Sequence, residues 1–371
     1  MTRRRFLGTT ALGAAAFAIG AQCDPALLRR IEQAKTAGPP THSAWVWQFS
    51  VDGTPEQIAA NLRANGLAAI LKTHDGVEWM SKYDHHADAI DGPAQIRRLA
   101  DFFEDQGVPF HAWCVVHGTD PIREAQMVGE VLYSRARSVV LDLEGSSGFW
   151  RGTKDDAVRF GEELRRIAPN GRVDISIDAR PWRINLVPME EFVYYTDGIW
   201  PQLYWDTFST QSNLDAYRNS GYPAGASGMT PEFLLDTTWQ LLQGYDRQII
   251  PVGQGASTDG AMWGRFAARA WQVGMGSVSV WRYGVTPYET LVYLGENPAG
   301  LAPQPPRNTP TAQGSPTRTP SATKTPKNTR TPSPTKTVTR TPTRTPTPSA
   351  STPVPSATNT PLPSATLTPL S

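Results

Sequence analysis

Two carboxylates placed two residues apart, Asp142 and Glu144, are the residues of this sequence whose spacing most directly suggests chemistry. They end the run SVVLDLEG at positions 138–145, whose valines and leucines are typical of a buried strand. Side chains alternate faces along a strand, so both carboxylates point to one side, about 7 Å apart, while Leu141 and Leu143 point to the other. Two acids on one buried face need partners or shifted pKa values. Such a pair can divide the work of acid catalysis, one acid kept protonated and the other ionised.

The elements that position these acids form an alternating pattern. Short β-rich runs and helical patterns alternate eight times between Ser43 and Glu296. This alternation indicates parallel βαβ units, and eight of them in about 250 residues predict a closed (β/α)8 TIM barrel over 43–300. A doubly wound open sheet is the alternative, but no G-x-G-x-x-G follows the first strand. The strands are expected at 44–49, 68–74, 109–117, 138–144, 172–178, 198–205, 248–254 and 277–283, and the helices at 54–66, 92–107, 120–135, 153–168, 231–243, 259–274 and 287–295.

A barrel of this kind gathers its functional groups where the strands end at their carboxyl side. The expected catalytic residues are Glu144, Asp142 and Asp178. Twelve tryptophans lie in the barrel segment, and several fall near strand ends, where indole rings can stack on sugar faces. The expected substrate-binding residues are Lys72, His74, Asp75, Trp113, His117, Arg180, Gln202, Tyr204, Trp205, Asp206, Gln254, Trp281 and Tyr283.

Three strings together resemble a known family. D-x-E ends the fourth predicted strand, QLYW lies on the sixth, and VWRYG lies on the eighth. This set resembles the chitinase-like (family 18) and lysozyme-like (family 25) glycoside hydrolase barrels. The resemblance implies that Glu144 is the general acid and that Asp142 orients an N-acetyl group of the substrate. It also implies that Tyr204 contacts that group and that Trp281 forms the floor under the sugar.

The sequence departs from both family patterns. The chitinase pattern D-x-x-D-x-D-x-E would place aspartates where this chain has Arg137 and Val140, and the first predicted strand lacks the aspartate of the lysozyme-like family. The seventh predicted strand ends in Gln254, where two-glutamate glycosidases carry a nucleophile. Two routes to hydrolysis therefore stay open: assistance by an N-acetyl group of the substrate, or a second carboxylate supplied by Asp178 or Asp206.

Charge and motif content exclude several functions. The segment between the two ends of the chain carries 34 Asp and Glu against 24 Lys and Arg, a net charge of −10, which argues against binding nucleic acid or an anionic membrane. No P-loop, G-x-S-x-G or H-E-x-x-H string is present. The acidic and histidine-rich run KYDHHADAID is interpreted as a solvated loop, and Cys114 as a core residue. We expect no cofactor, no metal and a monomer.

Both ends of the chain differ from the middle. Residues 1–23 contain TRRRFL followed by a weakly apolar run, which is typical of a twin-arginine export signal. Cys23 leaves a lipoprotein alternative open, although Gln22 fits a lipobox poorly. Residues 303–371 are rich in Thr and Pro and are expected to form a disordered, basic stalk, with O-glycosylation as an option. No other run is long enough for a transmembrane span. The expected location is extracellular or at the cell surface.

Three functions are compatible with these features. The leading hypothesis is an exported glycoside hydrolase that cleaves an N-acetylated polysaccharide such as peptidoglycan. The second is a barrel that binds a glycan through the same aromatic residues without cleaving it. The third is a structural surface protein in which the stalk carries the function. A glutamate whose pKa is raised toward neutrality would favour the first hypothesis over the other two.

Overall fold

The computed structural model describes residues 41–146, 148–223 and 228–304. The expected export signal at 1–23 lies outside the described residues, as does the expected stalk apart from its first two residues. Among the described residues, no helix combines the length and the hydrophobicity that crossing a bilayer requires.

Parallel strands close into a barrel, as the sequence predicts. β1 pairs with both β2 and β10, so that the first and last strands of the sequence complete the ring. β8 and β9 both pair with β7 and are two parts of one strand, interrupted at Pro251, which has no N–H to donate to the sheet. The barrel strands are β1 (Ser43–Val46), β2 (Ala68–Asp75), β4 (Phe110–Val115), β5 (Ser138–Leu143), β6 (Arg172–Asp178), β7 (Gly198–Leu203), β8 (Gln248–Ile249), β9 (Val252–Gln254) and β10 (Ser279–Trp281); β3 (Glu78–Trp79) forms a hairpin with β2.

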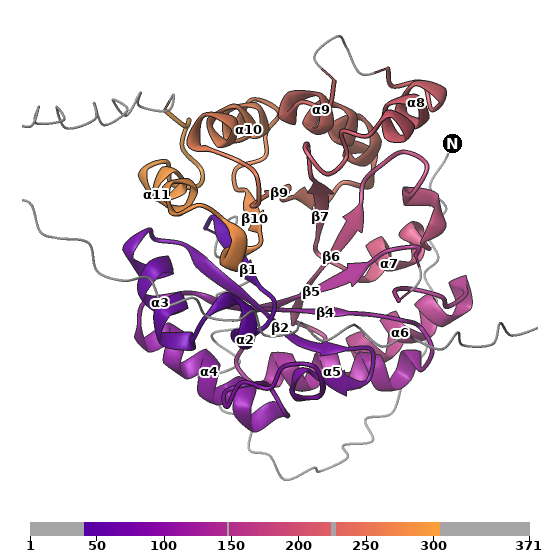
Figure 1. The fold of residues 1–371 in the computed structure, drawn as a ribbon. Helices are drawn as coiled ribbons and strands as arrows, with labels where there is room; N and C mark the ends of the chain where they lie inside the picture. The colour runs from indigo at the N-terminus through magenta and orange to yellow at the C-terminus, as the bar shows by residue number, and fades with distance from the viewer. Residues whose placement is uncertain (1–40, 147, 224–227, 305–371) are drawn as a thin grey trace, which may run out of the picture. The chain divides into compact units, whose positions relative to one another are not determined.

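Helices surround these strands (Figure 1). Several begin at the signals visible in the sequence: the Thr54 and Thr153 side chains cap their helices in full capping boxes, and Asp120 accepts from the backbone N–H of Arg123. The α-helices are α2 (Phe49–Asp52), α3 (Pro55–Ala64), α4 (Pro93–Asp105), α5 (Pro121–Tyr133), α6 (Lys154–Ile167), α7 (Met189–Tyr195), α8 (Gln211–Asn219), α9 (Pro231–Leu242), α10 (Gly260–Gln272) and α11 (Tyr288–Glu296). Short 3₁₀ turns are η1 (Met80–Lys82), η2 (Ile184–Leu186), η3 (Gln243–Tyr245) and η4 (Tyr283–Val285).

Three local features differ from the prediction. The first strand ends at Val46 rather than at 49, because the carboxylate of Asp84 accepts the backbone N–H groups of Phe49 and Ser50 and holds them in α2. α7 has only seven residues, too few to show a helical period. α8 is polar and buries only Tyr217, so it carries no apolar stripe.

The core has two layers, separated by the strand backbones. Outward-facing residues such as Leu141, Leu143 and Trp205 pack under the helices. Inward-facing residues fill the barrel, and they include Val140 and four tryptophans: Trp45, Trp113, Trp200 and, partly buried, Trp281. The two-residue alternation of each strand sorts its residues between these layers.

Candidate functional site

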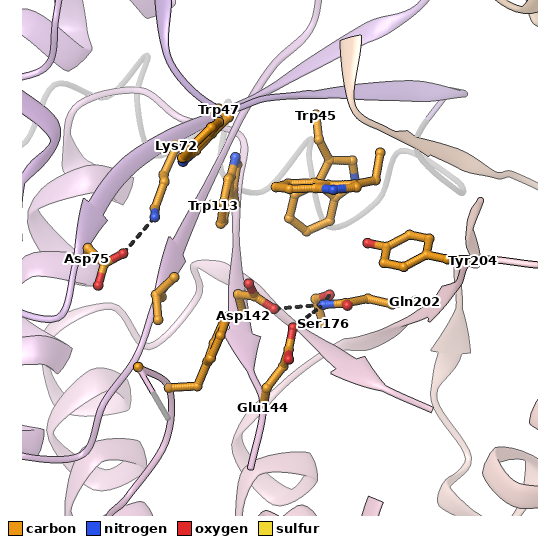
Figure 2. A pocket seen from close by; sticks show the side chains of 14 residues that line it. Trp45, Trp47, Lys72, Asp75, Trp113, Asp142, Glu144, Ser176, Gln202 and Tyr204 are labelled. Atoms are coloured by element: carbon orange, nitrogen blue, oxygen red, sulfur yellow. Dashed lines mark hydrogen bonds and ion pairs between the residues drawn. The ribbon is translucent and has the colours of Figure 1, made fainter. Parts of the chain in front are cut away.

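A cavity of about 410 Å³ opens among the strand ends inside the barrel. This volume lies in the range of small-molecule binding sites. Seven of the eight strand positions contribute to its lining, and the loop after β5 adds Gly148 and Phe149. The lining residues are Trp45, Trp47, Lys72, Asp75, Trp113, Val115, Asp142, Glu144, Gly148, Phe149, Ser176, Gln202, Tyr204 and Trp281, and most of them are labelled in Figure 2.

Asp142 and Glu144 both point into this cavity, and one side chain joins them. Nε2 of Gln202 donates to Oδ1 of Asp142 at 2.9 Å and to Oε1 of Glu144 at 3.0 Å (Figure 2). It also lies 3.2 Å from Oγ of Ser176. An amide has two N–H groups, so its two hydrogens serve three acceptors. Gln202 therefore fixes the two carboxylates relative to one another from β7, which is separated from β5 only by β6.

Both acids bind their protons more tightly than usual. Burial raises the pKa of Asp142 well above its ordinary range, and the Glu144 carboxylate raises it further. Burial also raises the pKa of Glu144, while the Gln202 hydrogen bond and the Arg180 guanidinium oppose the rise. Two carboxyls that share one amide cannot both ionise at low cost. The pair therefore keeps a proton at pH values where isolated carboxyls have lost theirs, which is the condition for acid catalysis.

Tyr204 faces the same two acids. It comes from the end of β7, two residues after Gln202, and its ring contacts Phe208 at 5.5 Å. Burial raises the pKa of its phenol well above the ordinary value, and the charges of Asp142 and Glu144 raise it further. The hydroxyl is therefore neutral and can donate a hydrogen bond into the cavity.

Indole rings form the wall and floor of the cavity. Trp45, Trp113 and Trp281 meet edge to face, with centroid separations of 5.2 Å, 5.7 Å and 5.3 Å for the three pairs. The indole N–H of Trp113 donates to the Val46 carbonyl, which fixes its ring. Aromatic faces of this kind bind the apolar C–H surfaces of sugar rings.

A charged group lies on the side of the cavity away from Gln202 and Tyr204 (Figure 2). Nζ of Lys72 is 2.7 Å from Oδ2 of Asp75 and 4.9 Å from the centroid of the Trp113 ring. Nε2 of His117 is 2.9 Å from the other Asp75 oxygen. The register of β2 against β4 shifts between Lys72 and His74, so that Lys72 and Asp75 both point into the barrel. Regular alternation would place these two side chains on opposite faces of the strand.

The loop that carries His117 is held by a buried carboxylate. Glu124, fully buried in α5, accepts the backbone N–H groups of residues 117 to 120 at 2.7 to 3.3 Å. Four amide donors replace the water that the carboxylate loses on burial. Glu124 therefore determines where His117 stands relative to Asp75.

Several predicted site residues lie away from the cavity. Trp205 follows Tyr204 directly, so it points outward and packs on Trp263 and Phe266. His74 is fully buried against Trp79 outside the barrel. The hydroxyl of Tyr283 accepts from the Asn61 amide, behind β1.

Gln254 and Asp206 support the loop after β7 and do not line the cavity. Oε1 of the Gln254 side chain accepts hydrogen bonds from the backbone N–H groups of Asp206 and Thr207 at 2.9 and 3.2 Å. Gln254 thereby ties the loop after β7 to β9, and neither its side chain nor that of Asp206 lines the cavity.

Asp178, the third predicted catalytic residue, is held in an ion pair. Its Oδ1 accepts from Nε of Arg180 at 2.8 Å, and its Oδ2 accepts from the terminal nitrogen of the same guanidinium. Neither residue lines the cavity, although the charges of both influence Glu144. The structure therefore brings together eight of the predicted residues, and these are Lys72, Asp75, Trp113, Asp142, Glu144, Gln202, Tyr204 and Trp281. His117 joins them only through Asp75.

The prediction missed lining residues whose signal was present. Ser176 precedes the predicted Asp178 by two residues, so strand alternation places both on one face. Trp45 and Trp47, also two residues apart at the end of β1, both line the cavity, and neither is among the expected substrate-binding residues. Phe149 stands in a loop, where no periodicity applies, and nothing in the sequence pointed to it.

Comparisons with known proteins find matches among solved structures alone. The chain matches no protein-family model and no curated protein. The catalytic domain of a hyperthermophilic chitinase from Pyrococcus furiosus is 12% identical, covering 69% of this chain and 94% of that chain, with a TM-score of 0.45. A family 18 chitinase from Pseudoalteromonas aurantia is 11% identical over 68% and 97% of the two chains, with a TM-score of 0.40. The spore cortex-lytic enzyme of Bacillus cereus is 10% identical over 72% and 83%, with a TM-score of 0.45.

Proposed function

We propose that this protein is a glycoside hydrolase that cleaves an N-acetylated polysaccharide, with Glu144 as the general acid. The observation that carries the proposal is the Asp142–Glu144 pair bridged by Gln202 inside a cavity walled by indole rings. The bridged pair supplies a retained proton, and the rings supply a surface for a sugar.

The substrate itself supplies the nucleophile in this mechanism. Asp178 is held in an ion pair with Arg180, and Asp206 does not line the cavity, so neither supports the role of second carboxylate.

Glu144 donates its proton to the glycosidic oxygen as the bond to C1 breaks. The acetamido oxygen of the same sugar attacks C1, and a carboxyl oxygen of Asp142 accepts the acetamido N–H. Tyr204 donates to the acetamido oxygen. Water then opens the ring intermediate, and Glu144 takes back a proton from that water.

The test compares hydrolysis by matched variants of the full chain. Release of reducing ends is measured from chitin, from peptidoglycan and from a plant polysaccharide without acetamido groups. Glu144→Gln is expected to lower kcat by roughly a thousandfold or more, because it removes the acid. Asp142→Asn is expected to lower kcat strongly on acetamido substrates. Glu56→Gln, at an exposed position of α3, is the matched control.

Two results would decide against the proposal. Equal cleavage of the plant polysaccharide would exclude assistance by the acetamido group. Binding of glycan without cleavage by wild type and Glu144→Gln alike would identify a glycan-binding barrel instead. One observation favours that second function: Val140, not an aspartate, lies beneath Asp142 in the barrel interior.

We further propose that residues 1–23 direct export by the twin-arginine pathway and that the Thr/Pro-rich segment 303–371 separates the barrel from its attachment point. The Arg3–Arg4 pair before Phe6 and Leu7 supports the first of these proposals. Replacing both arginines by lysine is expected to keep the protein inside the cell, as measured by fractionation. Export of that variant at the wild-type level would contradict the proposal.

A further inference from the structure

The loop after β6 lies directly against the end of β5, beside Glu144. Gly145 follows Glu144, and a Cβ built on Gly145 would stand 2.2 Å from Cβ of Leu186 and 2.9 Å from its carbonyl oxygen. No side chain fits between the two segments at this point. The loop that carries Arg180 and Arg183 is therefore a fixed neighbour of the proposed acid.

Two guanidinium groups in this loop share one carboxylate. Asp178 accepts hydrogen bonds from the Arg180 guanidinium through both of its oxygens. Arg183 stands farther away, with its Nε 3.8 Å from Oδ2 of Asp178, which is beyond hydrogen-bond distance. That Nε is buried, and it has no hydrogen-bond partner among the described residues. The three side chains together carry one positive charge that Asp178 does not neutralise.

The two arginines are held differently. The Arg180 guanidinium lies 4.5 Å from the centroid of the Phe208 ring and donates to Oδ1 of Asn213 at 3.1 Å, so it is fixed on several sides. The Arg183 side chain is 36% exposed. The Arg180 side chain is 16% exposed, so Arg183 is the more accessible of the two arginines.

This positive charge lies on the Glu144 side of the site. Both guanidinium groups act on Glu144 through space and hold its pKa down against the effect of burial, whereas neither lines the cavity. In the proposed mechanism the sugar that is attacked occupies the indole-walled cavity. The leaving sugar must then lie beside the acid that protonates its oxygen, and the loop after β6 is a neighbour of that acid.

We propose that Arg183, backed by Arg180, binds a carboxylate carried by the leaving sugar. The inference rests on the proposed hydrolase function and narrows its substrate to an acidic polysaccharide, in which an N-acetylated sugar is followed by a sugar that bears a carboxylate. A guanidinium recognises a carboxylate through N–H···O bonds, and the Arg183 side chain is 36% exposed, with its buried Nε unpartnered among the residues that the structure describes. The carboxylate belongs either to a uronic acid or to an acid attached to the ring through an ether.

The experiment measures kcat/KM of the full chain on three oligosaccharides of equal length: a neutral N-acetylated one, one with uronic acids, and one with ether-linked carboxylates. Wild type is expected to prefer one acidic substrate over the neutral one by about tenfold or more, since a charge-assisted pair contributes on this scale. Arg183→Gln is expected to bring that ratio close to one, and Arg183→Lys to restore part of it. The wild-type preference should shrink as salt rises. The control Arg98→Gln, on α4, should keep the full ratio.

The outcomes distinguish a failure of the proposed carboxylate subsite, formed by Arg183 and Arg180, from a failure of the proposed hydrolase function. Equal rates on all three substrates in wild type, or an equal loss on all three in Arg183→Gln, would overturn the subsite and leave the hydrolase intact. If wild type cleaves nothing, the hydrolase proposal fails, and titration of wild type and Arg183→Gln with the same oligosaccharides still decides the subsite. Tighter binding of an acidic oligosaccharide that disappears in Arg183→Gln would support it, and equal binding would contradict it.

Discussion

Gln202 on β7 donates to Asp142 on β5 over the intervening β6 at 2.9 Å, although the two residues lie 60 positions apart in the chain. The same nitrogen reaches Glu144, so one neutral amide controls the position and the proton of both acids. A site of this form depends on a residue that does no acid–base chemistry itself. That dependence leads to the first prediction.

Replacing Gln202 by methionine should shift the pH profile of hydrolysis upward. The amide hydrogen bonds favour the ionised forms of Asp142 and Glu144, so they lower both pKa values. Without them both values rise, and both limbs of the kcat/KM profile move to higher pH. Activity at the optimum should also fall by about tenfold to a hundredfold, the scale of a lost hydrogen bond to a charged group. Gln272→Met, exposed on α10, is the control, and an unmoved alkaline limb in Gln202→Met would contradict the role.

Trp281 and Trp205 give a matched pair of aromatic substitutions. Trp281 lines the cavity, whereas Trp205 packs outward on Trp263 and Phe266. Trp281→Ala should weaken glycan binding by about tenfold or more, since stacking and burial on an aromatic ring are worth one to a few kcal/mol. Trp205→Phe should lower the free energy of unfolding and leave binding unchanged. Titration by calorimetry and urea unfolding measure the two effects, and weakened binding in Trp205→Phe would reverse our placement of the two rings.

His74 should make the fold sensitive to acid. Burial lowers its pKa from 6.5 to about 3, so it stays neutral in the folded protein. Unfolded chains take up that proton below about pH 6.5, so stability falls as pH drops from there toward 3. The contribution is at most about 1.4 kcal/mol per pH unit. His74→Phe should flatten the loss of stability over this range, as measured by urea unfolding at several pH values. An unchanged slope would mean that His74 titrates equally in both states.

Glu124 should contribute to stability through its backbone partners. Its carboxylate accepts four consecutive N–H groups, and a glutamine at this position would turn an NH₂ toward some of those donors. Glu124→Gln should lower the free energy of unfolding by about 2–4 kcal/mol, the cost of breaking a buried charged network. Glu289→Gln, exposed on α11, should change it by less than about 0.5 kcal/mol. A loss below about 1 kcal/mol in Glu124→Gln would show that the loop does not depend on the charge.

The sequence alone determined the barrel and the pairing of its acids. Both follow from local periodicity: alternation of strands and helices sets the βαβ order, and the two-residue repeat of a strand puts Asp142 and Glu144 on one face. The same rule, applied strictly, would also have separated Trp205 from Tyr204.

Only the tertiary structure decided the rest of the site. The register shift after Lys72 turns Asp75 inward and His74 outward, and it depends on pairing between β2 and β4. The Gln202 bridge depends on how β7 stands relative to β5, and the ion pair that removes Asp178 depends on the path of the loop after β6. These contacts join residues that are distant in the sequence. The pattern of a strand determines on which face of the sheet a side chain lies, but it does not determine which side chains of other strands lie opposite it.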